Sequence, residues 1–186
     1  MTLLISRAMN NSRFALAVAL SAFTALSWVP LAGAANAAGM LSCTETGTVT
    51  WSPPGIGTLP STVNWSDKIS FSNCSGTAVD QGLPIPVSEE DQGTEIANCS
   101  GTVDAHTGTG TILWNDGTSS KVSSTAISQS KQNGTGPGNF PIRILTGNYR
   151  GKSATDSDTV TASDNPSGPC PGLTSATLDG TFTIAD

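Results

Sequence analysis

The chain has 186 residues, of which 12% are charged and 5% aromatic, and this length allows one domain or at most two small ones. Residues 38–186 contain 23 Thr and 20 Ser, a composition that excludes a long helical bundle, and their many β-branched residues argue against disorder. The same residues carry six basic and fourteen acidic side chains, a net charge of −8. Nucleic acid and anionic membranes are therefore excluded as partners, because both require basic patches.

The first 37 residues have the organisation of a signal peptide. Arg7 and Arg13 precede a mostly apolar, uncharged stretch at 14–31, and Ala35-Asn36-Ala37 has the A-x-A form of a cleavage site. A retained membrane anchor is the alternative, but it would need about 20 apolar residues. We expect a signal peptide at 1–37 and a single secreted domain at 38–186, extracellular or associated with the cell wall, with no membrane insertion after cleavage.

Short β-like segments separated by turn residues fill the rest of the chain. We expect strands at about 41–51 and 62–73, and in the second of these Asp67 is the one polar residue in an apolar period-2 register. This position favours a bulge or the rim of the sheet. Leu83–Val87 also alternates, but its two prolines cannot donate ladder hydrogen bonds, so we expect an edge strand there. A further short strand is expected at 95–103.

The clearest hairpin joins residues 109–114 to residues 118–128 through Asn115-Asp116-Gly117, because these three residue types tolerate positive φ. Residues 140–146 are expected to pair with 153–162, and the last strand is expected at 175–185. Residues 132–139 are typical of a flexible loop. Seven to nine short strands and no convincing helix predict an all-β fold, an antiparallel sandwich or, alternatively, a closed or partly open barrel.

The four cysteines, Cys43, Cys74, Cys99 and Cys170, are typical of two disulfides in an exported chain. We favour the pairs Cys43–Cys74 and Cys99–Cys170, because an antiparallel hairpin brings Cys74 back toward Cys43. The pairs Cys74–Cys99 with Cys43–Cys170, and the crossed pattern, remain alternatives. Consecutive cysteines are separated by 31, 25 and 71 residues, and these spacings do not fit a zinc site.

Three segments, Gly110–Ser123, Gly147–Lys152 and Cys170–Ile184, have a composition and spacing in common with known exported proteins. In these segments the chain resembles small, exported, Thr- and Gly-rich proteins of actinobacteria. This resemblance implies export and assigns no functional residue.

The residues that could carry chemistry are few. His106, the only histidine, lies in a segment that is typical of an exposed turn, without a nucleophile elbow such as G-x-S-x-G nearby. The acidic runs Ser88–Asp91 and Asp156–Asp158 are expected on a solvated surface, with calcium bridging them as an alternative. We expect no catalytic residue, no metal site and no cofactor.

The aromatic residues suggest a binding surface. Trp65 and Trp114 each lie close to Asp or Asn in the sequence, the composition of a sugar-binding platform, although the core also needs them. The candidate surface contains Trp65, Asp67, Trp114, Asn115, Asp116 and Tyr149. The sequence therefore favours an exported, non-enzymatic binding module for an extracellular protein or glycan. The alternatives are a hydrolase with paired carboxylates and a protease inhibitor that uses the loop at 132–139.

Overall fold

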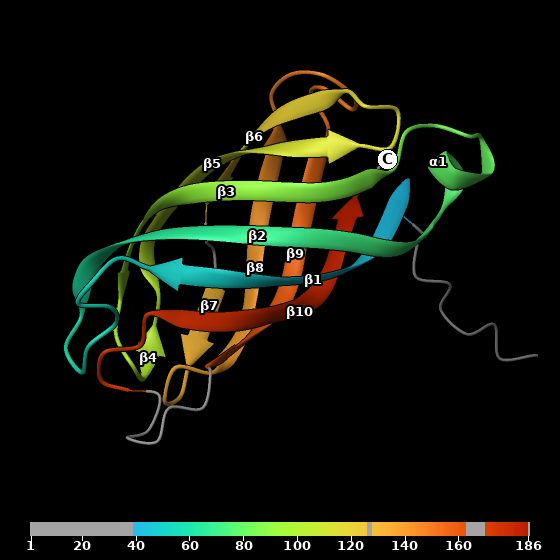
Figure 1. The fold of residues 1–186 in the computed structure, drawn as a ribbon. Helices are drawn as coiled ribbons and strands as arrows, with labels where there is room; N and C mark the ends of the chain where they lie inside the picture. Colours follow the sequence, from blue (N-terminus) through green and yellow to red (C-terminus); the bar gives the residue numbers. More distant parts are fainter. Residues whose placement is uncertain (1–38, 126–127, 163–169, 186) are drawn as a thin grey trace, which may run out of the picture. The chain divides into compact units, whose positions relative to one another are not determined.

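The structure is a computed structural model that describes residues 39–125, 128–162 and 170–185, most of which form antiparallel strands (Figure 1). The expected signal peptide lies outside these residues. Within the described ranges the one helix, α1 (Thr77–Asp80), has four residues, and no helix is long and apolar enough to cross a membrane.

Eight strands close into a ring. They pair in the order β8-β6-β5-β3-β2-β1-β10-β9, and hydrogen bonds between β8 and β9 complete the circle. The strands are β1 (Leu41–Trp51), β2 (Ser61–Ser75), β3 (Pro86–Ala97), β5 (Asp104–Trp114), β6 (Ser119–Thr125), β8 (Gly136–Ile144), β9 (Ser153–Ala162) and β10 (Ser175–Ile184). Two short strands, β4 (Gly101–Thr102) and β7 (Ser128–Lys131), extend the sheet beside β8. The expected sandwich is wrong, and the alternative of a closed barrel is confirmed.

Several expected strands are confirmed by the structure. β1 has the expected bounds, the β5–β6 hairpin turns at residues 115–118, and β8 pairs with β9 as expected. These elements combine period-2 patterns with clear turn residues at their ends, and both signals are local in the sequence.

Other expectations are wrong. The segment at 83–87 is no edge strand, because β3 begins at Pro86 and lies between β2 and β5. The strand expected at 95–103 is divided between the end of β3 and β4. The loop expected at 132–139 enters β8 at Gly136, and the backbone N–H of Gly134 donates to the Cys99 carbonyl at 2.7 Å. Asp67 lies at neither a bulge nor the rim, because the β2–β3 register continues through it without a shift.

Both disulfides have the favoured pairing, Cys43–Cys74 and Cys99–Cys170. Cys43 and Cys74 lie on the neighbouring strands β1 and β2, as the hairpin argument predicts. Two disulfides indicate that the chain folds in an oxidising setting.

Side chains that point into the barrel form two apolar clusters, and Phe71 on β2 packs against both. One includes Trp51, Trp65, Val160 and Leu178, and the other includes Leu41, Ile112, Trp114 and Phe182. Interior positions of an eight-stranded barrel are normally filled by such side chains. Here the apolar filling is interrupted between the two clusters, and the interruption positions the candidate site.

Candidate functional site

Acidic side chains interrupt the apolar interior of the barrel, and all but Asp67 lie between the two clusters. Six carboxyl groups point inward from four strands, and we call this set the acidic chamber: Glu45 on β1, Asp67 on β2, Glu89 and Asp91 on β3, and Asp156 and Asp158 on β9. The expectation of a solvated acidic surface is therefore wrong for Glu89, Asp91, Asp156 and Asp158, although Glu90 and Ser157 do face solvent. In a strand, residues two apart share a face, and barrel closure turns that face inward.

The strand register brings these carboxyl groups together. Asp67 is the direct cross-strand partner of Asp91. Gly180 on β10 is paired with Glu45 on one side and with Asp158 on the other. A Cβ atom at position 180 would lie 2.7 Å from Glu45 Oε1, closer than such contacts allow. The absence of a side chain at Gly180 therefore makes room for the Glu45 carboxyl group.

Most of the chamber is buried and lacks hydrogen-bond donors. Glu45 and Glu89 are each 1% exposed, and neither oxygen of either side chain has a partner. One oxygen each of Asp91, Asp156 and Asp158 is also buried without a partner. Because an isolated carboxylate is very costly to bury, the chamber must be neutralised by protons or by a cation.

Glu89 and Asp91 form one pair of interacting carboxyl groups. Burial, followed by the charge of Asp91, raises the pKa of Glu89 well above its usual range. Burial raises the pKa of Asp91 to about 6, while the neighbouring Glu89 carboxyl group opposes this rise.

Glu45 and Asp156 form a second pair. Burial and the charge of Asp158 raise the pKa of Glu45 to about 8, and the neighbouring Asp156 carboxyl group limits the rise. Burial, followed by the charge of Glu45, raises the pKa of Asp156 well above its usual range. Burial also raises the pKa values of Asp158 and Asp67 to about 7 each, and for Asp67 the charge of Asp91 contributes. The chamber thus holds several protons at neutral pH.

A second interior group shows how this barrel satisfies a carboxylate. Glu95 accepts hydrogen bonds from Trp51 Nε1 at 2.9 Å and from His106 Nδ1 at 3.0 Å, and Lys131 Nζ lies 3.6 Å away. Burial favours the neutral acid, but the His106 hydrogen bond, the Lys131 charge and the Trp51 N–H outweigh it, so the pKa of Glu95 is lowered. The Lys131 ammonium also lies 4.9 Å from the centre of the Trp51 ring.

His106 is therefore not the exposed turn residue that the sequence suggested. It lies on β5, is 9% exposed, and stacks on Trp65 with the ring centres 4.7 Å apart. The buried imidazole of His106 holds the Glu95 carboxyl group by a hydrogen bond, which is a structural arrangement. No local pattern indicates it, because Glu95 comes from another strand.

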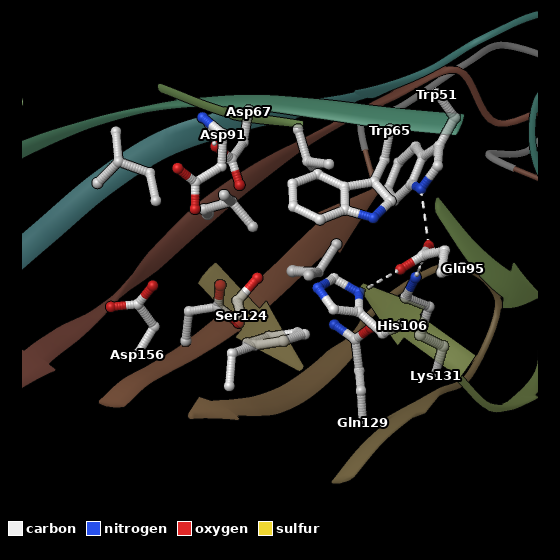
Figure 2. Close-up of a pocket in the computed structure, with 16 residues that line it drawn as sticks. Trp51, Trp65, Asp67, Asp91, Glu95, His106, Ser124, Gln129, Lys131 and Asp156 are labelled. Atoms are coloured by element: carbon white, nitrogen blue, oxygen red, sulfur yellow. Dashed lines mark hydrogen bonds and ion pairs between the residues drawn. The ribbon is translucent and has the colours of Figure 1, made fainter. Parts of the chain in front are cut away.

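A cavity of about 40 Å³ joins the Glu95 group to the acidic chamber. Figure 2 shows Asp67 and Asp91 side by side along one side of this cavity, with Asp156 across from them and Glu95 and Lys131 at one end. Aromatic side chains complete the lining: Trp51, Trp65, His106 and Phe140. Two further buried polar atoms, Trp65 Nε1 and Ser124 Oγ, have no partner. The volume accommodates a few water-sized groups.

The chamber does not have the arrangement of a metal centre. Among residues 39–125, 128–162 and 170–185, no three His, Cys, Asp or Glu side chains converge as metal ligands would. Calcium needs six to eight oxygen ligands around one point, so the idea of calcium between the two acidic runs gains no support from the geometry.

The six residues of the candidate binding surface are divided between two places. Trp65 and Asp67 belong to the cavity lining described above, and Trp65 is 6% exposed. Trp114 is 1% exposed and packs against Tyr149, with ring centres 5.0 Å apart, in the other apolar cluster. Neither indole face is open to solvent, so a flat tryptophan platform is not formed.

Asn115 and Asp116 are exposed in the β5–β6 turn, where their side chains hold the backbone. Asn115 Oδ1 accepts a hydrogen bond from the Ile85 N–H at 3.1 Å, and Asp116 Oδ1 accepts one from the Thr118 N–H at 2.9 Å. The Tyr149 hydroxyl donates to the Pro84 carbonyl at 2.7 Å. The polar groups of this region thus stabilise a turn and its neighbouring loops.

Comparison with known proteins gives no family assignment: no protein-family model matches the chain, and no curated protein matches it. The functional argument therefore depends on the geometry of the barrel interior.

Proposed function

We propose that the chain is an exported, non-enzymatic barrel that binds a small organic cation, a protonated amine, in its acidic chamber. The observation that supports this most strongly is that three residues of the cavity lining, Asp91, Asp156 and Asp158, each have one buried carboxyl oxygen without a partner. A buried acceptor of this kind needs a donor or a positive charge beside it.

The charge balance of the interior favours a cation. Lys131 is the one lysine or arginine that is buried among the described residues, and Glu95 already pairs with it. The six carboxyl groups of the chamber have no comparable counter-charge. A cation that entered the chamber would take the place of protons that the carboxyl groups otherwise hold.

The lining favours an amine over a metal ion. Aromatic rings attract organic cations over their faces, and carboxylates accept hydrogen bonds from ammonium groups. Lys131 provides an example inside the same barrel, because its ammonium lies between the Glu95 carboxylate and the Trp51 ring. The cavity of about 40 Å³ fits a small amine such as methylammonium and is too small for a sugar ring.

The alternatives from the sequence receive less support. Paired carboxylates do occur, but they lie inside a closed barrel, where a glycosidic bond would not reach them. A glycan platform would need an exposed indole face, and Trp65 and Trp114 are buried. A protease inhibitor needs a protruding loop, whereas Gly134 is tied to Cys99.

The test is a titration of the exported, disulfide-bonded protein with methylammonium chloride at pH 8, against sodium chloride at equal ionic strength. We expect saturable heat in calorimetry and a rise in melting temperature with methylammonium alone. An Asp158→Asn variant should bind at least several-fold more weakly, because Asp158 lines the cavity, whereas Glu90→Gln, which changes an exposed acid on β3, should bind like wild type. Equal behaviour in the two salts would contradict the proposal, and a response to calcium chloride instead would indicate a metal site.

A further inference from the structure

Two neutral polar atoms of the cavity lining also need partners, and an ammonium group alone does not provide them. Trp65 and Ser124 are each 6% exposed, and neither Trp65 Nε1 nor Ser124 Oγ has a hydrogen-bond partner within the described part of the chain. An indole N–H is only a donor, whereas a hydroxyl both donates and accepts. Because an ammonium group also offers donors alone, a simple amine in the cavity would leave Trp65 Nε1 without an acceptor.

The strand register brings these two atoms to the same place. One row of direct cross-strand partners runs through β2, β3, β5 and β6: Trp65, Gly93, Gly108 and Ser124. A Cβ atom at position 108 would lie 2.5 Å from Ser124 Oγ and 2.7 Å from the Trp65 ring. The indole therefore extends toward Ser124, because neither glycine places a side chain between them.

A carboxylate acceptor lies one step along β5 from Ser124 Oγ. Gly110 follows Gly108 on the same face of the strand, and Asp91 Oδ1, which is also buried without a partner, occupies the space beside it. Alternate residues of a strand are about 7 Å apart. Figure 2 shows Trp65 between Asp91 and Glu95 along the cavity. The lining thus places an anionic acceptor and two neutral polar groups within the reach of one small molecule.

We propose that the ligand of this cavity is a short amino alcohol, whose ammonium group binds the carboxyl groups and whose hydroxyl binds Trp65 Nε1 and Ser124 Oγ. This inference rests on the proposed function, because it names the class of amine that the same cavity takes. The hydroxyl oxygen would accept a hydrogen bond from the indole N–H and exchange one with Ser124. Each of the buried atoms without a partner would then gain one.

The cavity limits the length of this molecule. A volume of about 40 Å³ holds about three or four water-sized groups. Hydrogen bonds of about 3 Å at both ends of an interval of about 7 Å leave space for a short spacer only. Ethanolammonium, which consists of an ammonium group, two methylene groups and a hydroxyl, has this size. Its trimethylated derivative is too large and has no N–H group to donate to Asp91.

The test compares ethanolammonium chloride with propylammonium chloride, in which a methyl group replaces the hydroxyl. Both amines are protonated at pH 8, where each is titrated by calorimetry into the exported, disulfide-bonded protein. We expect ethanolammonium to bind at least about tenfold more tightly, because the methyl group would leave the buried N–H of Trp65 without an acceptor. Methylammonium, titrated alongside, measures whether the cavity takes amines at all.

Two variants locate the preference for the hydroxyl. Ser124→Ala should reduce the affinity ratio of the two amines about threefold or more, while the affinity for propylammonium stays within about twofold. This variant should fold, because Ser124 Oγ has no partner in the described part of the protein that its removal would leave unpaired. Trp65→Phe, which removes the indole N–H, should also reduce the ratio.

Two controls separate recognition of the hydroxyl from recognition of the charge. Ser123→Ala removes the neighbouring hydroxyl on the other face of β6 and should leave the affinity ratio unchanged. Asp158→Asn should weaken the binding of both amines by the same factor, because the two ligands carry the same ammonium group.

The outcomes distinguish this inference from the proposed function. If methylammonium binds but wild type shows no preference for ethanolammonium over propylammonium, the amino alcohol is wrong and the amine site stands. A preference that persists in both Ser124→Ala and Trp65→Phe would also overturn the inference, since the hydroxyl would then be recognised elsewhere. If no amine binds, the proposed function fails and the amino alcohol fails with it.

Discussion

Asp91 and Gly110 face each other across the β3–β5 ladder, and the carboxyl group of Asp91 fills the space that any side chain at position 110 would occupy. The glycine thus makes room for an acid in the barrel interior. Sequence and packing therefore meet at this pair of residues.

Gly110→Ala should destabilise the protein by about 1–3 kcal/mol, because the new methyl group would collide with the Asp91 carboxyl group. Urea unfolding at pH 6 measures the free energy of unfolding of this variant and of wild type. Gly57→Ala serves as the control, since a Cβ atom at position 57 would meet nothing within 4 Å. In an Asp91→Ala background, the cost of Gly110→Ala should fall but not vanish, because a Cβ atom at position 110 would still lie 2.5 Å from the Glu90 carbonyl oxygen. An equal cost in both backgrounds would mean that the contact with Asp91 is not its cause.

The stability of the protein should fall as the pH rises from about 4 to about 8 in the absence of amines. Burial raises the pKa of Glu45 from 4.5 to about 8 and that of Asp158 from 3.8 to about 7. In this window the folded protein therefore binds more protons than the unfolded chain, and the contribution of each group is lost as the pH passes its folded pKa.

Urea unfolding at pH 4, 6 and 8 in sodium chloride measures how steeply the free energy of unfolding falls with pH. Asp158→Asn should reduce the slope, because the amide does not titrate, whereas Asp179→Asn on the outer surface should leave it unchanged. Glu95 has the opposite effect, because its pKa is lowered in the folded protein and its contribution to stability is therefore lost at acidic pH. Stability that rises steadily from pH 4 to pH 8 would contradict a protonated chamber.

The sequence predicted the strands well and the acidic chamber poorly, for different physical reasons. β1 and the β5–β6 hairpin follow from alternation and turn residues, which are properties of neighbouring positions. The pairs Glu89 with Asp91 and Asp156 with Asp158 also carry a local signal, because a spacing of two places both carboxyl groups on one face. Which face becomes the interior depends on ring closure through the β8–β9 pairing, and no short segment encodes that.

The same limit explains the errors about single residues. His106 and Glu95 meet because β3 and β5 are adjacent, and the sequence alone does not show this neighbour relationship. Asp67 interrupts an apolar register, which is a further local sign of an interior acid. The interruption by itself favours a bulge or the rim of the sheet, because a buried carboxyl group is costly unless other groups share its proton or charge.

Glu95→Gln should destabilise the protein by about 3 kcal/mol, because it leaves Lys131 buried without its counter-charge. Glu90→Gln is the matched comparison, since it removes the exposed ion pair with Lys68 and should stay within about 0.5 kcal/mol of wild type. Chemical unfolding of the two variants at pH 7 measures both effects. Equal effects of the two substitutions would contradict the view that Lys131 depends on Glu95.

The binding of methylammonium should release protons, because the amine replaces protons that the chamber carboxyl groups hold at neutral pH. The pKa values of about 8 for Glu45 and about 7 for Asp158 mean that both groups are partly protonated at pH 7. Calorimetry in phosphate and in Tris, whose ionisation enthalpies differ, should therefore give different apparent binding enthalpies. At pH 5 the chamber is more fully protonated, so the affinity for methylammonium should be at least tenfold lower than at pH 8. Asp158→Asn should reduce the number of protons released, because Asp158 lines the cavity, whereas Glu90→Gln should leave it unchanged. Saturable binding with one apparent enthalpy in both buffers would show that the amine binds without displacing these protons.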